Sequence, residues 1–163
     1  MENPRARPMT PFQERFGRWT VQVMTAWNNV VFELSHGRVG GNVPSGAPIC
    51  LLTTTGRRSG EPRTVPLFCL PHDGRYVLVA SNGGMSGHPA WYLNLLTEPR
   101  AVIRLLDEAI PVSARLAEDA EREELWPLLT AGYEHFNAYR VRTDREIPIV
   151  VLVPSHESTT TAS

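Results

Sequence analysis

The stretch that decides the fold runs from residue 49 to residue 70 and reads ICLLTTTGRRSGEPRTVPLFCL. Residues 49–55 and 64–70 are apolar and rich in β-branched side chains, a composition that is typical of strands. Residues 56–63, which separate them, contain two glycines and a proline. Because these residues favour turns, the stretch predicts a hairpin with a long polar tip.

The same pattern of short strands continues along the chain. Residues 71–74 (PHDG) predict a tight turn, and four further strands are predicted at residues 76–81, 101–106, 110–116 and 147–153. Two helices are predicted at residues 88–96 and 118–133. Strands joined mostly as hairpins exclude a doubly wound parallel sheet. We therefore expect an α+β fold that is mainly β, in which antiparallel strands close into a small barrel with helices packed outside.

The two ends of the chain differ from this central part. Apolar residues recur at spacings of three and four from residue 12 to residue 34, which predicts one long amphipathic N-terminal helix. We expect a flexible N-terminus over residues 1–9, a single domain over residues 10–154, and a disordered polar tail over residues 155–163.

Composition indicates a cytoplasmic protein. The chain has 163 residues, 42% of them hydrophobic, and no apolar run near the roughly 20 residues that a membrane span needs. Cys50 and Cys69 do not form a CxxC pair, and the N-terminus does not resemble a signal peptide. An alternative location is peripheral to the inner face of the membrane. One face of the predicted N-terminal helix would then contact the lipid surface instead of packing on the barrel or on a partner subunit, through Phe12, Phe16, Trp19 and Trp27.

All of the 16 basic residues are arginines, so lysine chemistry is excluded. Residues 1–63 hold eight arginines against four acidic residues, although the net charge of the chain is −1. This excess predicts an anion site in the first half of the chain, but it is too weak for nucleic-acid binding. The five histidines are scattered without the spacing of a zinc site, so we expect no metal.

Two segments are candidate anion sites. Arg57, Arg58 and Arg63 lie at the predicted hairpin tip, where guanidinium groups grip phosphate or carboxylate well. Ser81-Asn82-Gly83-Gly84 follows a predicted strand and precedes a helix, an arrangement that also suits an anion. The alternatives are a solvated tip and an ordinary loop. Together, the two segments favour a ligand with a phosphate and a planar body.

Aromatic residues form a third candidate feature. Tyr133, Phe136 and Tyr139 are spaced by three, which places them on one face if the segment is helical. Such a stripe either belongs to the core or, together with Trp91 and Tyr92, forms a wall for a flat substrate.

Four motifs resemble those of the deazaflavin (coenzyme F420)-dependent nitroreductase family, which includes quinone reductases. They are ICLLTTTGRRSGEPR (49–63), ASNGG (80–84), PAWYLNL (89–95) and TDREIPIVV (143–151). The resemblance covers roughly residues 10–154 and implies a split β-barrel of the flavin-binding (FMN-binding-like) kind. It also implies hydride transfer from reduced F420 to an electron-poor acceptor such as a quinone or an activated alkene.

The resemblance assigns roles to particular residues. It implies that the cofactor is bound by Arg57, Arg58, Arg63, Pro66, Ser81, Asn82, Gly83 and Trp91. It implies that the substrate side is lined by Tyr133, Phe136 and Tyr139. Either tyrosine is a catalytic candidate that hydrogen-bonds the substrate oxygen and passes on a proton, with solvent as the alternative donor.

Two positions depart from the family. Members often carry lysine in the place of Asn82, and nitroimidazole-reducing members carry tyrosine in the place of Phe136. The first departure weakens or replaces one cofactor contact, and the second argues against prodrug nitroreduction.

Two alternatives to an F420-dependent reductase stay open: an FMN-binding barrel and a non-catalytic ligand carrier. An oligomer is compatible with all three functions.

Overall fold

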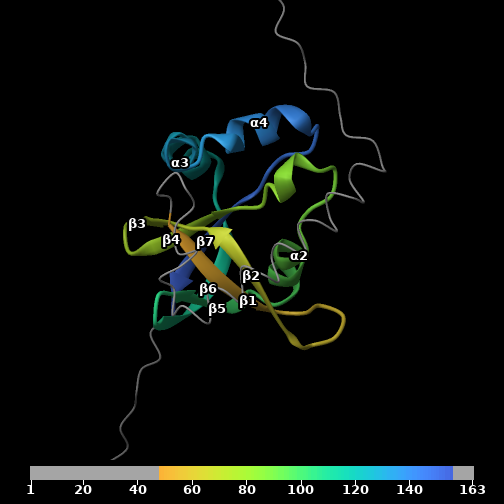
Figure 1. The fold of residues 1–163 in the computed structure, drawn as a ribbon, viewed down its shortest axis with the longest axis vertical. Coiled ribbons are helices and arrows are strands. Elements are labelled where there is room, and N and C mark those ends of the chain that lie inside the picture. The colour runs from red at the N-terminus through yellow and green to blue at the C-terminus, as the bar shows by residue number, and fades with distance from the viewer. Residues whose placement is uncertain (1–47, 156–163) are drawn as a thin grey trace, which may run out of the picture.

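Residues 48–155 are the part of the chain that the computed structural model describes (Figure 1). Their seven strands are β1 (Ile49–Thr55), β2 (Pro62–Phe68), β3 (Leu70–His72), β4 (Arg75–Val79), β5 (Arg100–Leu105), β6 (Glu108–Leu116) and β7 (Ile149–Pro154). Their helical segments are the 3-10 turn η1 (Asn82–Gly84) and the α-helices α2 (Ala90–Thr97), α3 (Asp119–Gly132) and α4 (His135–Arg142).

The strands form one antiparallel sheet in the order β2-β1-β5-β6-β7-β4-β3. The strands at its two edges, β2 and β3, follow each other in the chain with only Cys69 between them. A flat sheet of seven strands cannot place its edges one residue apart, because neighbouring strands are about 4.8 Å apart. The sheet therefore curves into a half-barrel, which confirms the mainly β fold with helices.

Cys69 also accounts for one wrong prediction. Residues 64–70 were expected to form a single strand, but β2 pairs with β1 as far as Phe68, and Leu70 pairs with Val77 of β4. Cys69 itself donates its backbone N–H to the Pro48 carbonyl at 3.0 Å. The apolar pattern runs on through this change of partner, so it does not mark the break. The other strands and helices predicted within residues 48–155 are present, with ends shifted by at most two residues.

Two hydrophobic cores lie on opposite faces of the sheet. Strand β7 contributes Val150 and Leu152 to the first core, and Ile149 and Val151 to the second. All four side chains are buried. An unbroken apolar run is expected in a strand that is covered on both faces, because successive side chains point to opposite sides.

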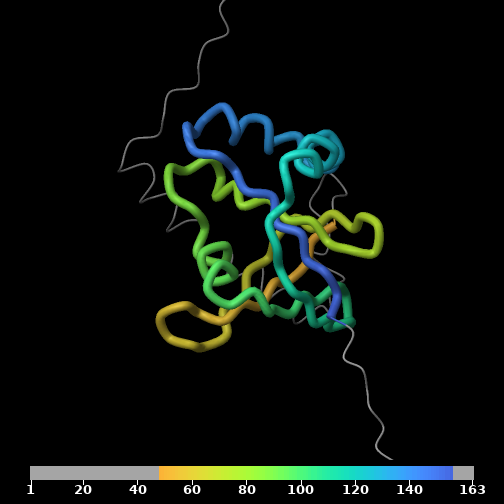
Figure 2. The backbone as a smooth tube through the Cα atoms, turned by 180° about the vertical axis from the view of Figure 1, so that it is seen from behind, coloured from red at the N-terminus to blue at the C-terminus, as the bar shows by residue number. Residues whose placement is uncertain are grey.

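The helices are divided between the two cores. Helix α2 packs on the first core through Trp91, Tyr92 and Leu95, and α3 covers the second through Leu125 and Leu129. Along one flank of the molecule, α4, η1, α2 and the β1–β2 loop follow one another, as both views show (Figures 1 and 2). This flank carries the residues discussed below.

The predicted N-terminal helix, the flexible N-terminus and nearly all of the polar tail lie outside the described residues. Between residues 48 and 155, no helix is long and apolar enough to cross a membrane. The same residues contain no group of three or more histidine, cysteine, aspartate or glutamate side chains placed to hold a metal ion.

Neighbouring leucines of α3 provide a test of the second core. Leu129 is fully buried, whereas Leu128 is 41% exposed. We expect Leu129→Ala to lower the free energy of unfolding by about 2–5 kcal/mol, because the truncation leaves a cavity under the helix. Leu128→Ala is the matched control and should lower the free energy of unfolding by well under half as much. Urea unfolding measures both, and equal losses would contradict the packing described.

Candidate functional site

The β1–β2 loop is a compact tip that is closed by its own backbone. Gly56 N–H donates to the Glu61 carbonyl at 2.8 Å, and Gly60 N–H donates to the Gly56 carbonyl at 2.7 Å. Gly60 has φ +72°, a conformation that side chains disfavour. A Cβ on Gly56 would lie 2.8 Å from Ser59 Oγ, so the tip has no room for a side chain there. The predicted hairpin is thus confirmed.

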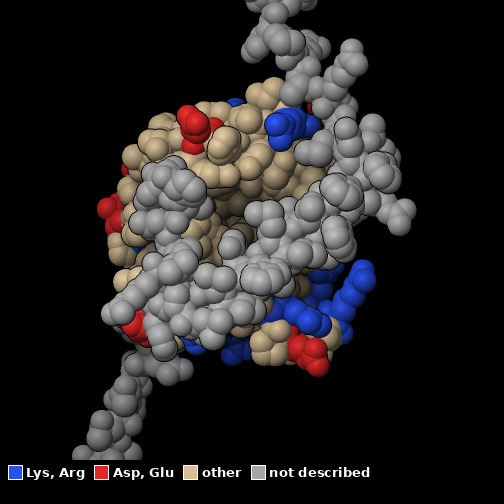
Figure 3. Space-filling view, viewed as in Figure 1, with Lys and Arg blue, Asp and Glu red and all other residues tan. Residues whose placement is uncertain are grey.

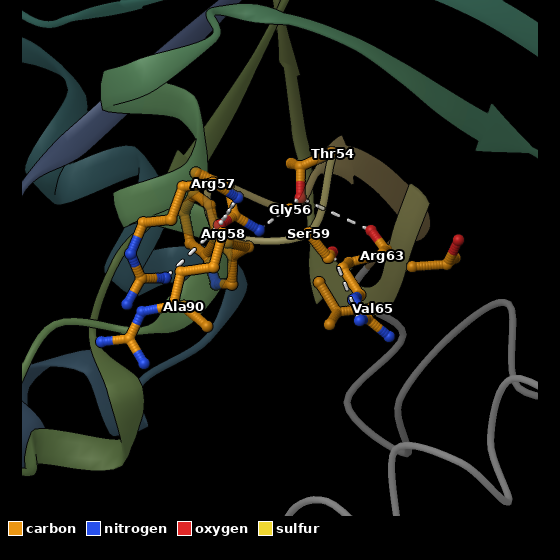
Figure 4. A pocket seen from close by; sticks show the side chains of 11 residues that line it. Thr54, Gly56, Arg57, Arg58, Ser59, Arg63, Val65 and Ala90 are labelled. Carbon is orange, nitrogen blue, oxygen red and sulfur yellow. Dashed lines mark hydrogen bonds between the residues drawn. The ribbon is translucent and has the colours of Figure 1, made fainter. Parts of the chain in front are cut away.

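The loop borders a cavity of about 420 Å³ between β1, β2 and α2. We call it the arginine pocket, because its rim carries Arg57, Arg58 and Arg63 (Figure 4). Basic side chains gather on the same flank in the space-filling view, at the lower right (Figure 3). The rest of the lining consists of Thr54, Gly56, Ser59, Thr64, Val65, Ala90, Trp91 and Asn94.

The charge at the rim is positive. Arg63 Nη2 lies 3.4 Å from Glu61 Oε2, and both side chains are largely exposed. Such an ion pair is weak because water screens it. Within residues 48–155, Arg57 and Arg58 form no ion pair with a carboxylate. The pocket therefore offers guanidinium donors to an anionic ligand.

A buried asparagine ties this loop to α2. Asn94 is 4% exposed, and its Oδ1 accepts hydrogen bonds from Arg57 N–H at 3.1 Å and from Arg57 Nη1 at 3.4 Å. Its Nδ2 donates to Thr54 Oγ1 at 3.1 Å, and Thr54 Oγ1 donates to the Arg63 carbonyl at 3.5 Å. Buried polar groups are costly unless they are paired. This chain of bonds therefore holds the backbone of Arg57 and Arg63 in position, from which their side chains extend to the rim.

Sequence reasoning did not single out Asn94. The available signal was a lone amide in the apolar run WYLNLL, since an asparagine inside a buried helix needs hydrogen-bond partners. The identity of those partners, about 40 positions earlier in the chain, depends on the fold.

The second candidate, which we call the glycine turn (residues 81–84), follows β4 and lies against α4. Asn82, Gly83 and Gly84 have φ values of +48°, +64° and +76°. A Cβ on Gly84 would lie 3.0 Å from the Tyr139 carbonyl oxygen, so only glycine allows this close approach. The Ser81 hydroxyl does not cap the turn, although Ser81 is buried. The glycine turn does not line the arginine pocket.

The three aromatic residues lie together at the junction of α3 and α4. Phe136 is 4% exposed, and its ring contacts those of Phe68 and Tyr133, with ring centres 5.4 and 4.9 Å away. Tyr133 and Tyr139 are half-buried, and their hydroxyl oxygens lie 3.3 Å apart. We call these two the tyrosine pair. Burial, and then the hydrogen bond shared with Tyr133, raises the pKa of Tyr139 to about 12.

Two cofactor candidates differ in their setting. Trp91 is 6% exposed and lines the arginine pocket. Pro66 pairs with Leu51 on the edge strand β2, where a missing N–H is tolerated, and it does not line the pocket.

Comparison with known proteins decides the family. A family model described as F420H(2)-dependent quinone reductase matches residues 24–154. The chain belongs to this family. A curated F420H(2)-dependent quinone reductase of Mycobacterium tuberculosis (strain H37Rv) is 32% identical over 128 residues, which is 77% of this chain and 86% of the relative.

Solved structures agree with this assignment. One F420-H2 dependent reductase is 40% identical, with a TM-score of 0.60 over 64% of this chain and 93% of its own. A second structure, described as a domain-swapped dimer, is 35% identical, with a TM-score of 0.61 over 76% of this chain and 97% of its own. As a member of the family, the chain is an oxidoreductase that uses coenzyme F420 as its cofactor and a quinone as acceptor.

The residues present fit such a cofactor. The arginine pocket brings the guanidinium groups of Arg57, Arg58 and Arg63 to one rim, where they can bind anionic groups. The buried face of Trp91 adds an apolar wall. This donor set suits a ligand that carries phosphate and carboxylate groups.

We expect Asn94→Ala to loosen the loop. The substitution removes the partner of Thr54 and Arg57, and an unpaired buried polar group costs about 1–3 kcal/mol. Urea unfolding should show a loss of this size, and F420 should bind more weakly because Arg57 is no longer oriented. The control is Asn137→Ala, which removes an exposed amide on α4. Equal effects of the two variants would contradict the positioning of the loop by Asn94.

Proposed function

We propose that the arginine pocket holds the phosphate and acidic tail of F420, and that the tyrosine pair serves the acceptor. The observation that carries the first part is the rim of three guanidinium groups around one cavity, with Arg57 held in place by Asn94. Charge-assisted bonds from arginine to phosphate or carboxylate are strong and directional. We propose the same cofactor role for Pro66, Ser81, Asn82, Gly83 and Trp91.

When bound, reduced F420 supplies a hydride, so the protein needs no nucleophile of its own. A quinone that accepts a hydride becomes an anion, and its oxygen then takes up a proton. The task of this chain is to align the two partners and to stabilise that negative charge.

The tyrosine pair suits this task. Tyr139 keeps its proton at neutral pH, as an ordinary tyrosine does, and its raised pKa of about 12 extends this to alkaline pH, so we assign it as a hydrogen-bond donor to the acceptor oxygen. Tyr133 Oη lies within reach of Tyr139 Oη and is placed to pass on a proton from solvent. We assign the buried ring of Phe136 to the apolar base of this acceptor site.

We also propose activated alkenes as acceptors. The hydroxyl that nitroimidazole-reducing members carry is missing at Phe136, so we do not expect prodrug nitroreduction. We infer that the half-barrel is the flavin-binding split barrel with a long N-terminal helix, and that the protein forms oligomers. Membrane contact through that helix stays a prediction.

Titration of the purified protein with oxidised and reduced F420, against FMN as control, tests the proposed function. Fluorescence quenching reports binding, and loss of reduced F420 after addition of menadione reports turnover. We expect tight F420 binding with turnover. Preference for FMN, or binding without turnover, would overturn the proposal in favour of a flavin-binding protein or a ligand carrier.

We expect Arg58→Ala to weaken F420 binding by an order of magnitude or more, because one charge-assisted contact contributes roughly 1.5–3 kcal/mol. Fluorescence titration measures the change in Kd. Arg100→Ala, which removes an exposed arginine paired with Glu98 on β5, is the control and should leave the Kd unchanged. Unchanged affinity for Arg58→Ala would indicate that the loop arginines are merely solvated.

We expect Tyr139→Phe to lower kcat with menadione by tenfold or more while changing the F420 Kd less than threefold. The reason is that the variant loses a donor to the acceptor and keeps the ring. Tyr76→Phe on β4 is the matched control. A larger effect on the F420 Kd than on kcat would contradict the assignment.

The raised pKa of Tyr139 adds a pH dependence. An ordinary tyrosine loses its proton around pH 10, whereas Tyr139 stays protonated until about pH 12. The contribution of this hydroxyl to kcat should therefore be constant from pH 7 to pH 10. The ratio of kcat between the parent and Tyr139→Phe measures it. A ratio that falls with a midpoint near pH 10 would contradict the raised pKa of Tyr139, and a ratio close to one at every pH would contradict the donor role.

A further inference from the structure

The guanidinium of Arg145 lies between the glycine turn and the segment that leads from α4 into β7. An arginine carries five N–H donors. Nε donates to the Met85 carbonyl at 3.0 Å. Nη2 donates to the carbonyls of Ala80 at 3.2 Å and of Ser81 at 2.7 Å. Nη1 donates to the Glu146 carbonyl at 3.4 Å and lies 3.2 Å from His88 Nδ1. All five donors therefore have an acceptor.

Three of these acceptors bracket the glycine turn. Ala80 and Ser81 enter it, and Met85 leaves it. Between them, Asn82, Gly83 and Gly84 all have positive φ, a conformation that asparagine and glycine adopt more readily than other residues. The Asn82 side chain also donates to the Gly87 carbonyl at 2.8 Å. The forked guanidinium holds both ends of the turn at once.

The charge of Arg145 is not neutralised nearby. Its five acceptors are four backbone carbonyls and one imidazole nitrogen, and within residues 48–155 it forms no ion pair with a carboxylate. The side chain is only partly accessible to water. A positive charge thus lies against the backbone of the turn, where it favours the binding of an anionic ligand.

The pKa of His88 is sensitive to the charge of Arg145. Its Nδ1 faces Arg145, and its ring lies against Tyr92, with centres 4.9 Å apart. Burial, and then the charge of Arg145, lowers the pKa of His88. Removal of the charge should therefore raise that pKa, whether or not a cofactor is bound.

We propose that Arg145 is a positioning residue, which holds the glycine turn in its cofactor-binding shape and adds positive charge behind it. The inference rests on the proposed function, because it assigns the turn to F420. Arg145 touches neither the arginine pocket nor the tyrosine pair in any bond described above, so it acts through the turn.

Two variants separate the hydrogen bonds from the charge. Arg145→Lys keeps the charge and loses the fork, whereas Arg145→Gln loses both. Arg100→Gln is the control, since Arg100 is exposed on β5. Four quantities are measured: the F420 Kd, the menadione KM at saturating F420, the pKa of His88 by NMR, and the hydrogen exchange of the Gly84 and Met85 amides. These two amides donate within the turn, to the carbonyls of Ser81 and Asn82.

In both variants we expect the amide hydrogens of Gly84 and Met85 to exchange with solvent at least tenfold faster than in the parent. We expect the F420 Kd to rise about tenfold in Arg145→Lys and further in Arg145→Gln, with the menadione KM changed less than twofold. The pKa of His88 should rise in Arg145→Gln alone. Exchange rates and Kd within twofold of the parent in both variants would overturn the inference. A rise in the menadione KM as large as that in the F420 Kd would also overturn it, since it would indicate general disorder.

The failure of the proposed function would look different. If the unmodified protein bound no F420, the assignment of the turn to that cofactor would fall for the parent and the variants alike. The exchange of the Gly84 and Met85 amides in the free protein would still decide whether Arg145 holds the turn.

Discussion

The structure depends on the single residue that joins the two edges of its sheet. Cys69 has no exposed surface, and the strands on either side of it occupy opposite ends of the strand order. The sheet must therefore curve until its first and last strands meet. This curvature creates an inner face for α2 and an outer face for α3 and α4, and so determines the division into two cores.

The functional flank follows from this arrangement. Because α2 packs on the inner core, its buried Asn94 reaches the β1–β2 loop and bonds Arg57 at the rim and Thr54 at the end of β1. Because α4 covers the outer core, its backbone presses against the glycine turn at Gly84. The arginine pocket and the tyrosine pair are thus attached to different cores, and Arg145 bonds the glycine turn to the segment that follows α4.

Local pattern predicted most of this fold and part of the site. Residues 49–55 were predicted as a strand with the correct ends, because a β-branched run followed by glycine leaves little choice. The break at Cys69 was missed, since a strand that changes partner keeps its apolar pattern. The hairpin tip that carries Arg57, Arg58 and Arg63 was predicted from the glycines and the proline between two apolar runs. Asn94 and Arg145 were not, because the meaning of a buried amide or a fully bonded guanidinium depends on backbone atoms that only the fold brings near.

The contact at Gly84 has a consequence for which residues this position tolerates. A methyl group there would meet the Tyr139 backbone at 3.0–3.1 Å, so turn and helix would have to separate by a few tenths of an ångström. The clearance between the glycine turn and α4 is therefore set by one hydrogen atom in place of a side chain. Because Gly84 also has φ +76°, a substitution there would strain the turn as well as push it away from the backbone of Tyr139.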